Sequence, residues 1–431
     1  MLGISAQLTR REKIGFRLHT IYMILEGVIL GLLVLNEFIF IKSLKGSNYQ
    51  MSFLFVFSMA VYIFLVFVNE YLKRIKNKRK LLRWTSLITR IPLLFMLFFP
   101  DNEKDLVASG YYHYIFLAIF LVYYFGDMIK NPTINYLLKG NYRHENFGKL
   151  YSYSTSVNKI VMLFATFLFG VLLDWDPYFF RYAYAFAAIL CVVSLHILSL
   201  IPKPSNGEIV EEVKRDRIWV SVKKSFREMR GILSVNKPYL HFQIGFMFYG
   251  FSFMISVTII TIFFYEQLNL NYSSVAFYRN AYNILAILLL PFFGRLLGHI
   301  DPRRFGIITY SSIAVYIFFL WMTMYFPSNF EVFGIRIYFT MILYILAHGI
   351  FAATMSLLWN IGSAYFCRPE QAGTYHSVHL SATGFRALFA PLLGVFFFEL
   401  FGFEFTFALA IFSLLMAILV MRWSYVRYPR V

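Results

Sequence analysis

Long apolar runs separated by short polar segments make up most of the chain. Each run has about 20 residues, the length that an α-helix needs to cross the roughly 30 Å hydrocarbon core of a bilayer. The runs lack the alternation of a strand, and lipid offers no partner for a backbone amide, so the pattern predicts membrane-spanning helices. Twelve are expected, which makes the fold class an all-α membrane protein. The predicted spans are 18–41, 51–72, 81–100, 111–138, 150–173, 178–201, 239–266, 273–297, 305–326, 336–362, 374–399 and 404–422.

Composition and charge agree with this pattern. Of 431 residues, 59% are hydrophobic and 14% are charged, and the formal net charge is +18. The basic residues gather in the termini and in the loops on their side, whereas the opposite loops carry acids such as Asp101 and Glu331. This positive-inside pattern places both termini in the cytoplasm and explains the charge without a nucleic-acid partner. We expect an integral multi-pass protein of the bacterial inner (plasma) membrane.

The sequence predicts no metal site and no cofactor. Cys191 lies within span six and Cys367 in a cytoplasmic loop, and neither position suits a disulfide or a zinc site. The histidines are scattered over several spans, so we expect no enzyme active site. No P-loop motif occurs, which excludes ATP as the driving force. The first apolar run is too long for a signal peptide and is interpreted as a retained span.

A polar segment at 202–237 divides the chain into two sets of six spans. We therefore predict an N-terminal bundle at 1–201, a cytoplasmic linker at 202–237 and a C-terminal bundle at 238–431. Within the linker, apolar residues recur at helical spacing with basic residues between them, which predicts an amphipathic helix on the inner leaflet. A solvated charged linker is the alternative. The apolar positions are Trp219, Val222, Phe226 and Met229.

The two halves match each other at one offset of 225 residues. Ser152 matches Ser377, and Asn135 matches Asn360. "LFA" at 163–165 matches "LFA" at 388–390. One offset that serves separate regions indicates an internal repeat of two like-oriented bundles, with a substrate site between them near the bilayer midplane.

Two loop motifs carry a resemblance to a known family. The segment "GRLLGHIDPRRFG" at 294–306, between spans eight and nine, resembles the loop signature of the major facilitator superfamily. Its acid is displaced and Pro302 stands where the family has a glycine. The segment "NFGKLYSYSTSV" at 146–157 is similar to the family's entry to span five. The resemblance implies the twelve-span fold of this superfamily and transport by alternating access.

The loop motif also predicts a conformational latch. Glycine lets helices approach or the chain turn sharply, and an aspartate caps a helix start or pairs with arginine. A plain basic anchor on the inner leaflet is the alternative. The latch residues are Gly294, Asp301, Arg303 and Arg304.

Charges within spans are costly and mark candidate functional residues. Glu26 in span one has no cation within four positions on its own helix, so it is either a proton carrier or an acid paired with a neighbouring lysine. Asp127 and Lys130 in span four are three residues apart and can pair with each other. We assign Glu26 and Asp127 to proton coupling and Lys130 to substrate binding. Arg90 in span three is interpreted as structural.

The substrate-binding candidates are mainly basic. Lys159 in span five, together with His379 and Arg386 in span eleven, extends polar stripes on helices that border the cavity in the superfamily. Asn135 and Asn360 are the repeat-matched polar positions. An excess of cations in a water-filled cavity favours an anionic substrate, because the cavity then carries positive potential.

These observations predict a secondary active transporter that acts as a monomer, moves a small polar or anionic organic solute and is coupled to protons. An efflux pump for amphipathic compounds or lipids is the alternative within transport, although Gly170 stands alone where exporters carry several span-five glycines. A non-transporting membrane sensor or scaffold is the alternative from another class, and no additional soluble domain supports it.

Overall fold

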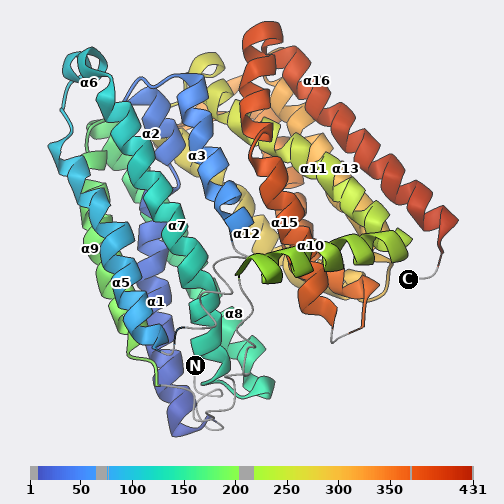
Figure 1. The fold of residues 1–431 in the computed structure, drawn as a ribbon. Coiled ribbons are helices and arrows are strands. Elements are labelled where there is room, and N and C mark those ends of the chain that lie inside the picture. The colour runs from blue at the N-terminus through green and yellow to red at the C-terminus, as the bar shows by residue number, and fades with distance from the viewer. Residues whose placement is uncertain (1–7, 65–74, 76, 203–217, 369–370, 430–431) are drawn as a thin grey trace. The chain divides into compact units, whose positions relative to one another are not determined.

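The computed structural model describes residues 8–64, 75, 77–202, 218–368 and 371–429, and they form two compact units (Figure 1). The first unit comprises Met1–Gly46 with Phe64–Ser221, and the second comprises Ser47–Ile63 with Val222–Val431. The predicted first bundle at 1–201 included residues 47–63. That segment instead packs against three helices of the second unit, so the compact units differ from the predicted division there.

All regular secondary structure in the described part of the first unit is helical. Its first helix starts at a capping box, in which the Thr9 hydroxyl accepts a hydrogen bond from the Glu12 amide and the Glu12 carboxylate accepts one from the Thr9 amide. The helices are α1 (Arg10–Leu33), α2 (Asn36–Lys42), the 3-10 helix η2 (Val61–Phe64, whose last residue falls here), α5 (Lys78–Arg90), η3 (Ile91–Phe98), α6 (Glu103–Ser109), α7 (Tyr111–Lys139), α8 (His144–Trp175) and α9 (Phe180–Ser199).

Glycines set the spacing of α1 and α8. A Cβ on Gly31 would lie 2.6 Å from the Ala165 Cβ, and one on Gly27 would lie 2.6 Å from the Asn158 carbonyl oxygen. Both distances are shorter than side chains allow, so the two backbones touch where glycine leaves room. This contact fixes which face of α1 turns to α8 and which face turns to the rest of the unit.

The second unit is also mostly helical. Its elements are α3 (Asn48–Ala60), α10 (Ile218–Val235), α11 (Lys237–Ile262), the π-helix η5 (Phe263–Gln267), α12 (Tyr272–Leu297), α13 (Pro302–Met322), β1 (Asn329–Val332), β2 (Ile335–Tyr338), α14 (Phe339–Ile361), η6 (Gly362–Phe366), α15 (Ala372–Ala387) and α16 (Ala390–Arg427). Helix α11 packs along α16, α13 packs between α14 and α16, and α3 packs against α15 and α16. Asn48 at the start of α3 donates to the carboxylates of Glu266 and Glu399, at 3.2 and 2.9 Å.

The described residues contain ten helical segments long and apolar enough to span a membrane, and a shorter apolar helix at Asn48–Phe64. One of the ten, Thr374–Arg427, covers both of the last two predicted spans, and Gly402 breaks the helix between them with φ 76°. If this segment is counted as two crossings and the shorter helix as the predicted second span, the described segments correspond to the twelve predicted crossings. The predicted start of span one at 18 was too late, since the capped helix begins at Arg10.

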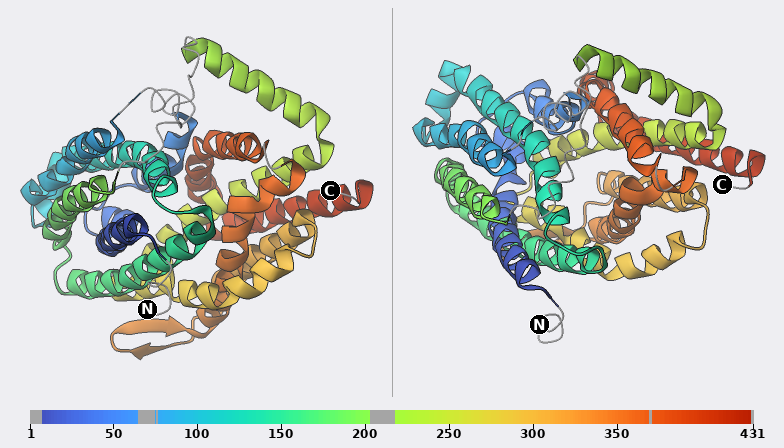
Figure 2. Two further views of the ribbon diagram at one scale, coloured as in Figure 1. Left: turned by 90° about the horizontal axis from the view of Figure 1, so that it is seen from below. Right: turned by 60° about the horizontal axis from the view of Figure 1, so that its bottom comes forward.

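The segment between α13 and α14 contains a feature that the all-α prediction lacked. Strands β1 and β2 form an antiparallel hairpin at the edge of its unit, with Asn329 opposite Tyr338 (Figure 2). Phe333 and Gly334 form its turn, both with positive φ. A two-residue turn with positive φ at both positions usually has Asn-Gly or Gly-Gly. Phe-Gly does not match that pattern, so the hairpin was not predicted from the sequence.

The predicted amphipathic helix is present as α10. It runs across the other helices of its unit rather than along them (Figures 1 and 2). Lys223, Arg227 and Arg230 are exposed. Three of the four side chains of the predicted apolar stripe lie outside the described residues, namely Trp219, Val222 and Phe226. The contact of α10 with the inner leaflet therefore stays a prediction.

Candidate functional site

Four charged side chains, three of them buried and Asp127 21% exposed, form a continuous chain in the first unit. Arg90 from α5 contacts Asp127 of α7 at 2.5 Å, Asp127 contacts Lys130 at 2.9 Å, and Lys130 contacts Glu26 of α1 at 2.5 Å. Arg90, Lys130 and Glu26 are each less than a tenth exposed. The charges alternate in sign and sum to zero, which is the arrangement that makes buried ions tolerable.

The two carboxylates of this chain differ in their partners. Among the described residues, Asp127 contacts two cations, whereas Glu26 contacts Lys130 alone. Removing the charge of Glu26 would still leave Lys130 paired with Asp127. Removing the charge of Asp127 would leave Arg90 without its carboxylate partner. Glu26 is therefore the acid of the chain whose charge can be removed without leaving either buried cation unpaired.

Sequence reasoning found part of this chain. The pairing of Asp127 with Lys130 is confirmed. Of the two alternatives for Glu26, the structure shows the pairing with a lysine of a neighbouring helix, Lys130, and its role as a proton carrier stays a prediction. The role of Arg90 was only described as structural, and its partner was missed. Gly126 lets α7 approach α5 at this point, since a Cβ there would collide with Thr89 and lie 3.3 Å from the Arg90 guanidinium carbon.

The second unit holds a buried arginine of a different kind. Arg386 of α15 is 2% exposed and donates to the Phe246 carbonyl oxygen of α11. Its guanidinium lies on Gly250, where any Cβ would overlap it. Its Nε is buried without a hydrogen-bond partner, and no carboxylate among the described residues pairs with it. Arg386 is thus a buried cation whose charge is not balanced within the described part of its unit.

His379 and Gln243 extend this second site. His379 Nδ1 lies 3.2 Å from Gln243 Oε1, and its ring packs against Phe246 and Trp359. The far atoms of both polar groups, His379 Nε2 and Gln243 Nε2, are buried without partners, as is the Nε of Arg386. Buried polar atoms normally find partners, so three unsatisfied ones in a small region mark a place for a polar ligand. Gln243 was missed because one glutamine in an apolar run gives no pattern.

The other predicted substrate residues lie elsewhere. Lys159 is exposed on α8 in the first unit. Asn360 is exposed on α14 and donates to the Ser356 carbonyl oxygen of its own helix. The side chain of Asn135 lies outside the described residues. Asn360 belongs to the same unit as Arg386 and His379, but among the described residues no hydrogen bond joins it to either of them.

His348 of α14 proves to be part of an aromatic stack. Its ring lies 3.6 Å from that of Tyr282 and 4.4 Å from that of Tyr316, nearly parallel to both. Its Nδ1 lies 3.1 Å from the Tyr344 hydroxyl. These contacts are those of a packed histidine.

Among the predicted latch residues, Arg303 makes the most contacts. Asp301 caps α13 by accepting from the Arg303 amide at 2.8 Å, and its carboxylate also pairs with the Arg303 guanidinium at 2.7 Å. The fully buried Arg303 donates in addition to the Ser424 and Tyr428 carbonyl oxygens at the end of α16. Arg304 lies over the Tyr425 ring, and Gly294 has open space around it. The loop is thus tied to the last helix through Arg303.

Comparison with known proteins supports the fold seen here. A family model described as Major Facilitator Superfamily matches residues 19–375. The solved structure of nucleoside transporter NupG is 12% identical, with a TM-score of 0.70 over 96% of this chain and 100% of that one. A D-xylose-proton symporter is 13% identical, with a TM-score of 0.63 over 93% and 96% of the two chains. A proton dependent oligopeptide transporter is 12% identical, with a TM-score of 0.65 over 96% and 98%. No curated protein matches the sequence.

Proposed function

The chain belongs to the major facilitator superfamily, and from that premise we propose that it moves a small anionic organic solute together with protons. Membership makes the protein an integral multi-pass secondary transporter of a small molecule, and not an enzyme. The charge of the solute and the identity of the coupling ion are the proposed parts.

The unbalanced charge of Arg386 is the observation that carries the anionic substrate. A buried cation without a counter-ion is unfavourable by several kcal/mol, so such a group is retained where a ligand supplies the missing charge. A guanidinium presents parallel N–H donors that match a carboxylate or a phosphate. His379 and Gln243 add neutral polar groups next to it. In the first unit, by contrast, the four charges of the chain from Arg90 to Glu26 cancel one another.

Glu26 supports the proton coupling. When Glu26 takes up a proton, the chain from Arg90 to Glu26 changes from neutral to a net charge of +1. A positive charge inside the protein strengthens the binding of an anion, and by linkage the bound anion strengthens the binding of the proton. Proton and anion are then carried together because each raises the affinity for the other. Two of the structural neighbours are described as proton-coupled, which is compatible with this proposal.

We also propose that both termini are cytoplasmic and that the membrane is the bacterial inner membrane, from the distribution of basic residues. Single cysteines at Lys223 in α10 and at Asp105 in α6, in a background without Cys191 and Cys367, test the orientation. A membrane-impermeant thiol reagent added to intact cells should label position 105 and not position 223. The opposite result would reverse the topology.

Reconstituted transport tests the function. Proteoliposomes with an imposed proton gradient are offered a panel of carboxylates and phosphate esters, each beside a neutral analogue of the same size. We expect accumulation of an anionic member of the panel and none of its neutral analogue. Arg386→Ala should abolish binding of that anion, whereas Arg295→Ala, which removes an exposed arginine elsewhere in the same unit, should not. Gradient-driven uptake of a neutral solute that survives Arg386→Ala would contradict the proposal.

A further inference from the structure

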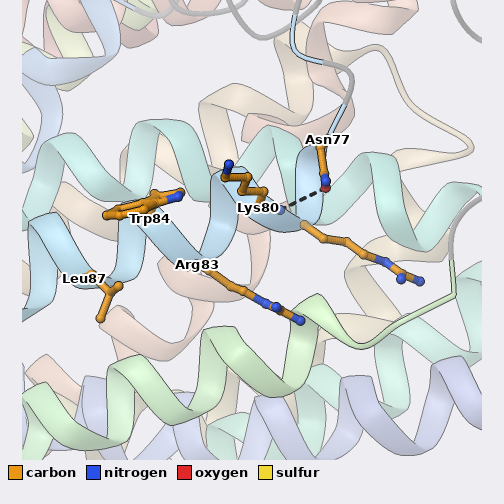
Figure 3. A pocket seen from close by; sticks show the side chains of 6 residues that line it. Asn77, Lys80, Arg83, Trp84 and Leu87 are labelled. Atoms are coloured by element: carbon orange, nitrogen blue, oxygen red, sulfur yellow. Dashed lines mark hydrogen bonds between the residues drawn. The ribbon is translucent and has the colours of Figure 1, made fainter.

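A basic pocket lies at the start of α5, away from the buried charge chain. It has a volume of about 600 Å³ and is open to the outside of the first unit (Figure 3). Its lining consists of Asn77, Arg79, Lys80, Arg83, Trp84 and Leu87. All of them belong to the first turns of α5 or cap its start. The Asn77 side chain accepts a hydrogen bond from the Lys80 amide and so fixes the first turn.

Two arginines of the pocket are held in place by the end of α9. Arg83 Nε donates to the Ser199 hydroxyl at 2.8 Å, and Arg79 donates to the Ile201 carbonyl oxygen. Cations are favourable at the carboxyl end of a helix, so these contacts order both side chains. Each contact uses one donor of its guanidinium and leaves the others for a ligand. Among the described residues, no carboxylate pairs with Arg79, Lys80 or Arg83, and Arg79 Nε is buried without a partner.

The same pocket also has an apolar side. Trp84 and Leu87, one turn further into the span, are 53% and 38% exposed. In Figure 3 the Trp84 ring lies on the same side of α5 as the Lys80 side chain, and Arg83 points away toward the neighbouring helix. A tryptophan at the edge of an apolar span takes the position typical of the membrane–water interface. The basic side chains of the pocket therefore lie at the depth of the bilayer where the lipid headgroups join the acyl chains.

We propose that this pocket binds an anionic phospholipid of the membrane. Lys80 contacts the phosphate, Arg83 adds its positive charge from the side of α9, and Trp84 and Leu87 pack against the beginning of an acyl chain. A ligand with both an anionic head and an apolar tail satisfies both sides of the pocket, whereas free phosphate would satisfy only the cations. The site does not depend on the proposed transport function, since none of its residues belongs to the buried charge chain or to the Arg386 site.

Quenching of Trp84 by brominated lipid tests the site. The full chain is placed in phosphatidylcholine nanodiscs that contain a small fraction of either brominated phosphatidylglycerol or brominated phosphatidylcholine. The Trp84 signal is the difference in fluorescence between the wild type and Trp84→Phe, which separates it from the other tryptophans. We expect brominated phosphatidylglycerol to quench this signal at a several-fold lower fraction than brominated phosphatidylcholine. Lys80→Gln with Arg83→Gln should remove the preference, by about fivefold for each cation.

A matched variant separates the pocket from the general positive charge of the protein. Lys13→Gln with Arg17→Gln removes the same charge from exposed positions of α1 and should leave the preference unchanged. Equal loss in both double variants, or equal quenching by the two brominated lipids, would overturn the proposal. Added inorganic phosphate should not restore the fluorescence. If it does so and abolishes the phosphatidylglycerol preference, the site binds a soluble anion and the lipid assignment is wrong.

Discussion

The Lys130 ammonium lies 2.5 Å from the Glu26 carboxylate, although the two residues belong to different helices and are more than 100 positions apart. The same ammonium contacts Asp127 at 2.9 Å. Lys130 therefore shares its charge between two acids, and the loss of one of them leaves it paired with the other. Loss of the Glu26 charge therefore leaves no buried cation unpaired, whereas loss of the Asp127 charge does, and this difference separates the expected effects of the two acids.

Glu26→Gln should uncouple transport from the proton gradient. Glutamine keeps the shape and hydrogen bonding of the side chain but cannot titrate, and Lys130 stays paired with Asp127. We expect the variant to bind substrate and to exchange it down a concentration gradient, and to lose the accumulation driven by a proton gradient. Exchange and gradient-driven uptake in proteoliposomes, beside equilibrium binding, measure this. Accumulation equal to that of the wild type would make Glu26 a structural acid and move the coupling site to Asp127 or to another ion.

Asp127→Asn should instead impair stability. It leaves Arg90 without its carboxylate partner, and Arg90 is 1% exposed. Removing one member of a buried ion pair typically destabilises by about 3–5 kcal/mol, because the remaining charge stays buried. The melting temperature of the purified variant should fall well below that of Glu26→Gln. The double variant Arg90→Met with Asp127→Asn removes both charges and should recover part of the loss. Equal melting temperatures for Asp127→Asn and Glu26→Gln would show that Arg90 finds another partner.

The sequence indicated the local part of these sites and missed the part that joins helices. Asp127 and Lys130 lie three positions apart on one helix, so their pairing follows from helical geometry alone. The contacts of Lys130 with Glu26 and of Arg90 with Asp127 depend on how α1, α5 and α7 are rotated about their axes. That rotation is set by packing such as the Gly27–Asn158 contact, which a single sequence does not reveal.

The internal repeat shows the same limit in the second unit. At the offset of 225, Arg386 matches Val161, whose Cβ packs against Gly27 of α1. In the first unit this place is a close helix contact, and in the second it is occupied by a guanidinium lying on Gly250. The repeat predicted which helices correspond. It did not predict that the second unit would hold a buried charge where the first has an apolar contact. The space for that charge depends on Gly250, and a glycine within an apolar run does not by itself indicate a buried arginine.

Gly250→Ala should weaken substrate binding although glycine itself offers no side chain to a ligand. The added methyl group would overlap the guanidinium and displace Arg386. If the arginine then loses a charge-assisted contact with the substrate, the loss is on the order of 2 kcal/mol, or roughly thirtyfold in affinity. Gly231→Ala in α10, where a Cβ meets no atom within 4 Å, is the matched control and should be neutral or slightly stabilising.

A double-variant cycle decides whether Gly250 acts through Arg386. In an Arg386→Ala background the overlap no longer exists, so adding Gly250→Ala should cause little additional loss of affinity. Additive losses would show that Gly250 affects binding by another route, such as the packing of α11 against α15.

The loop that joins α12 to α13 should control the rate of transport rather than the affinity for substrate. Arg303 connects Asp301 to the Ser424 and Tyr428 carbonyl oxygens, so it ties the start of α13 to the end of α16. Arg303→Lys keeps the charge but has no planar fork with which to contact all three groups at once. We expect a transport rate at least about tenfold lower, equivalent to ~1.4 kcal/mol on the conformational step, with equilibrium binding unchanged.

Arg304→Lys is the matched control. The one contact described for Arg304 is with the Tyr425 ring, so this variant should transport at nearly the wild-type rate. Two results would count against a latch centred on Arg303: equal rates for the two variants, or a loss of substrate binding in Arg303→Lys that matches its loss of rate.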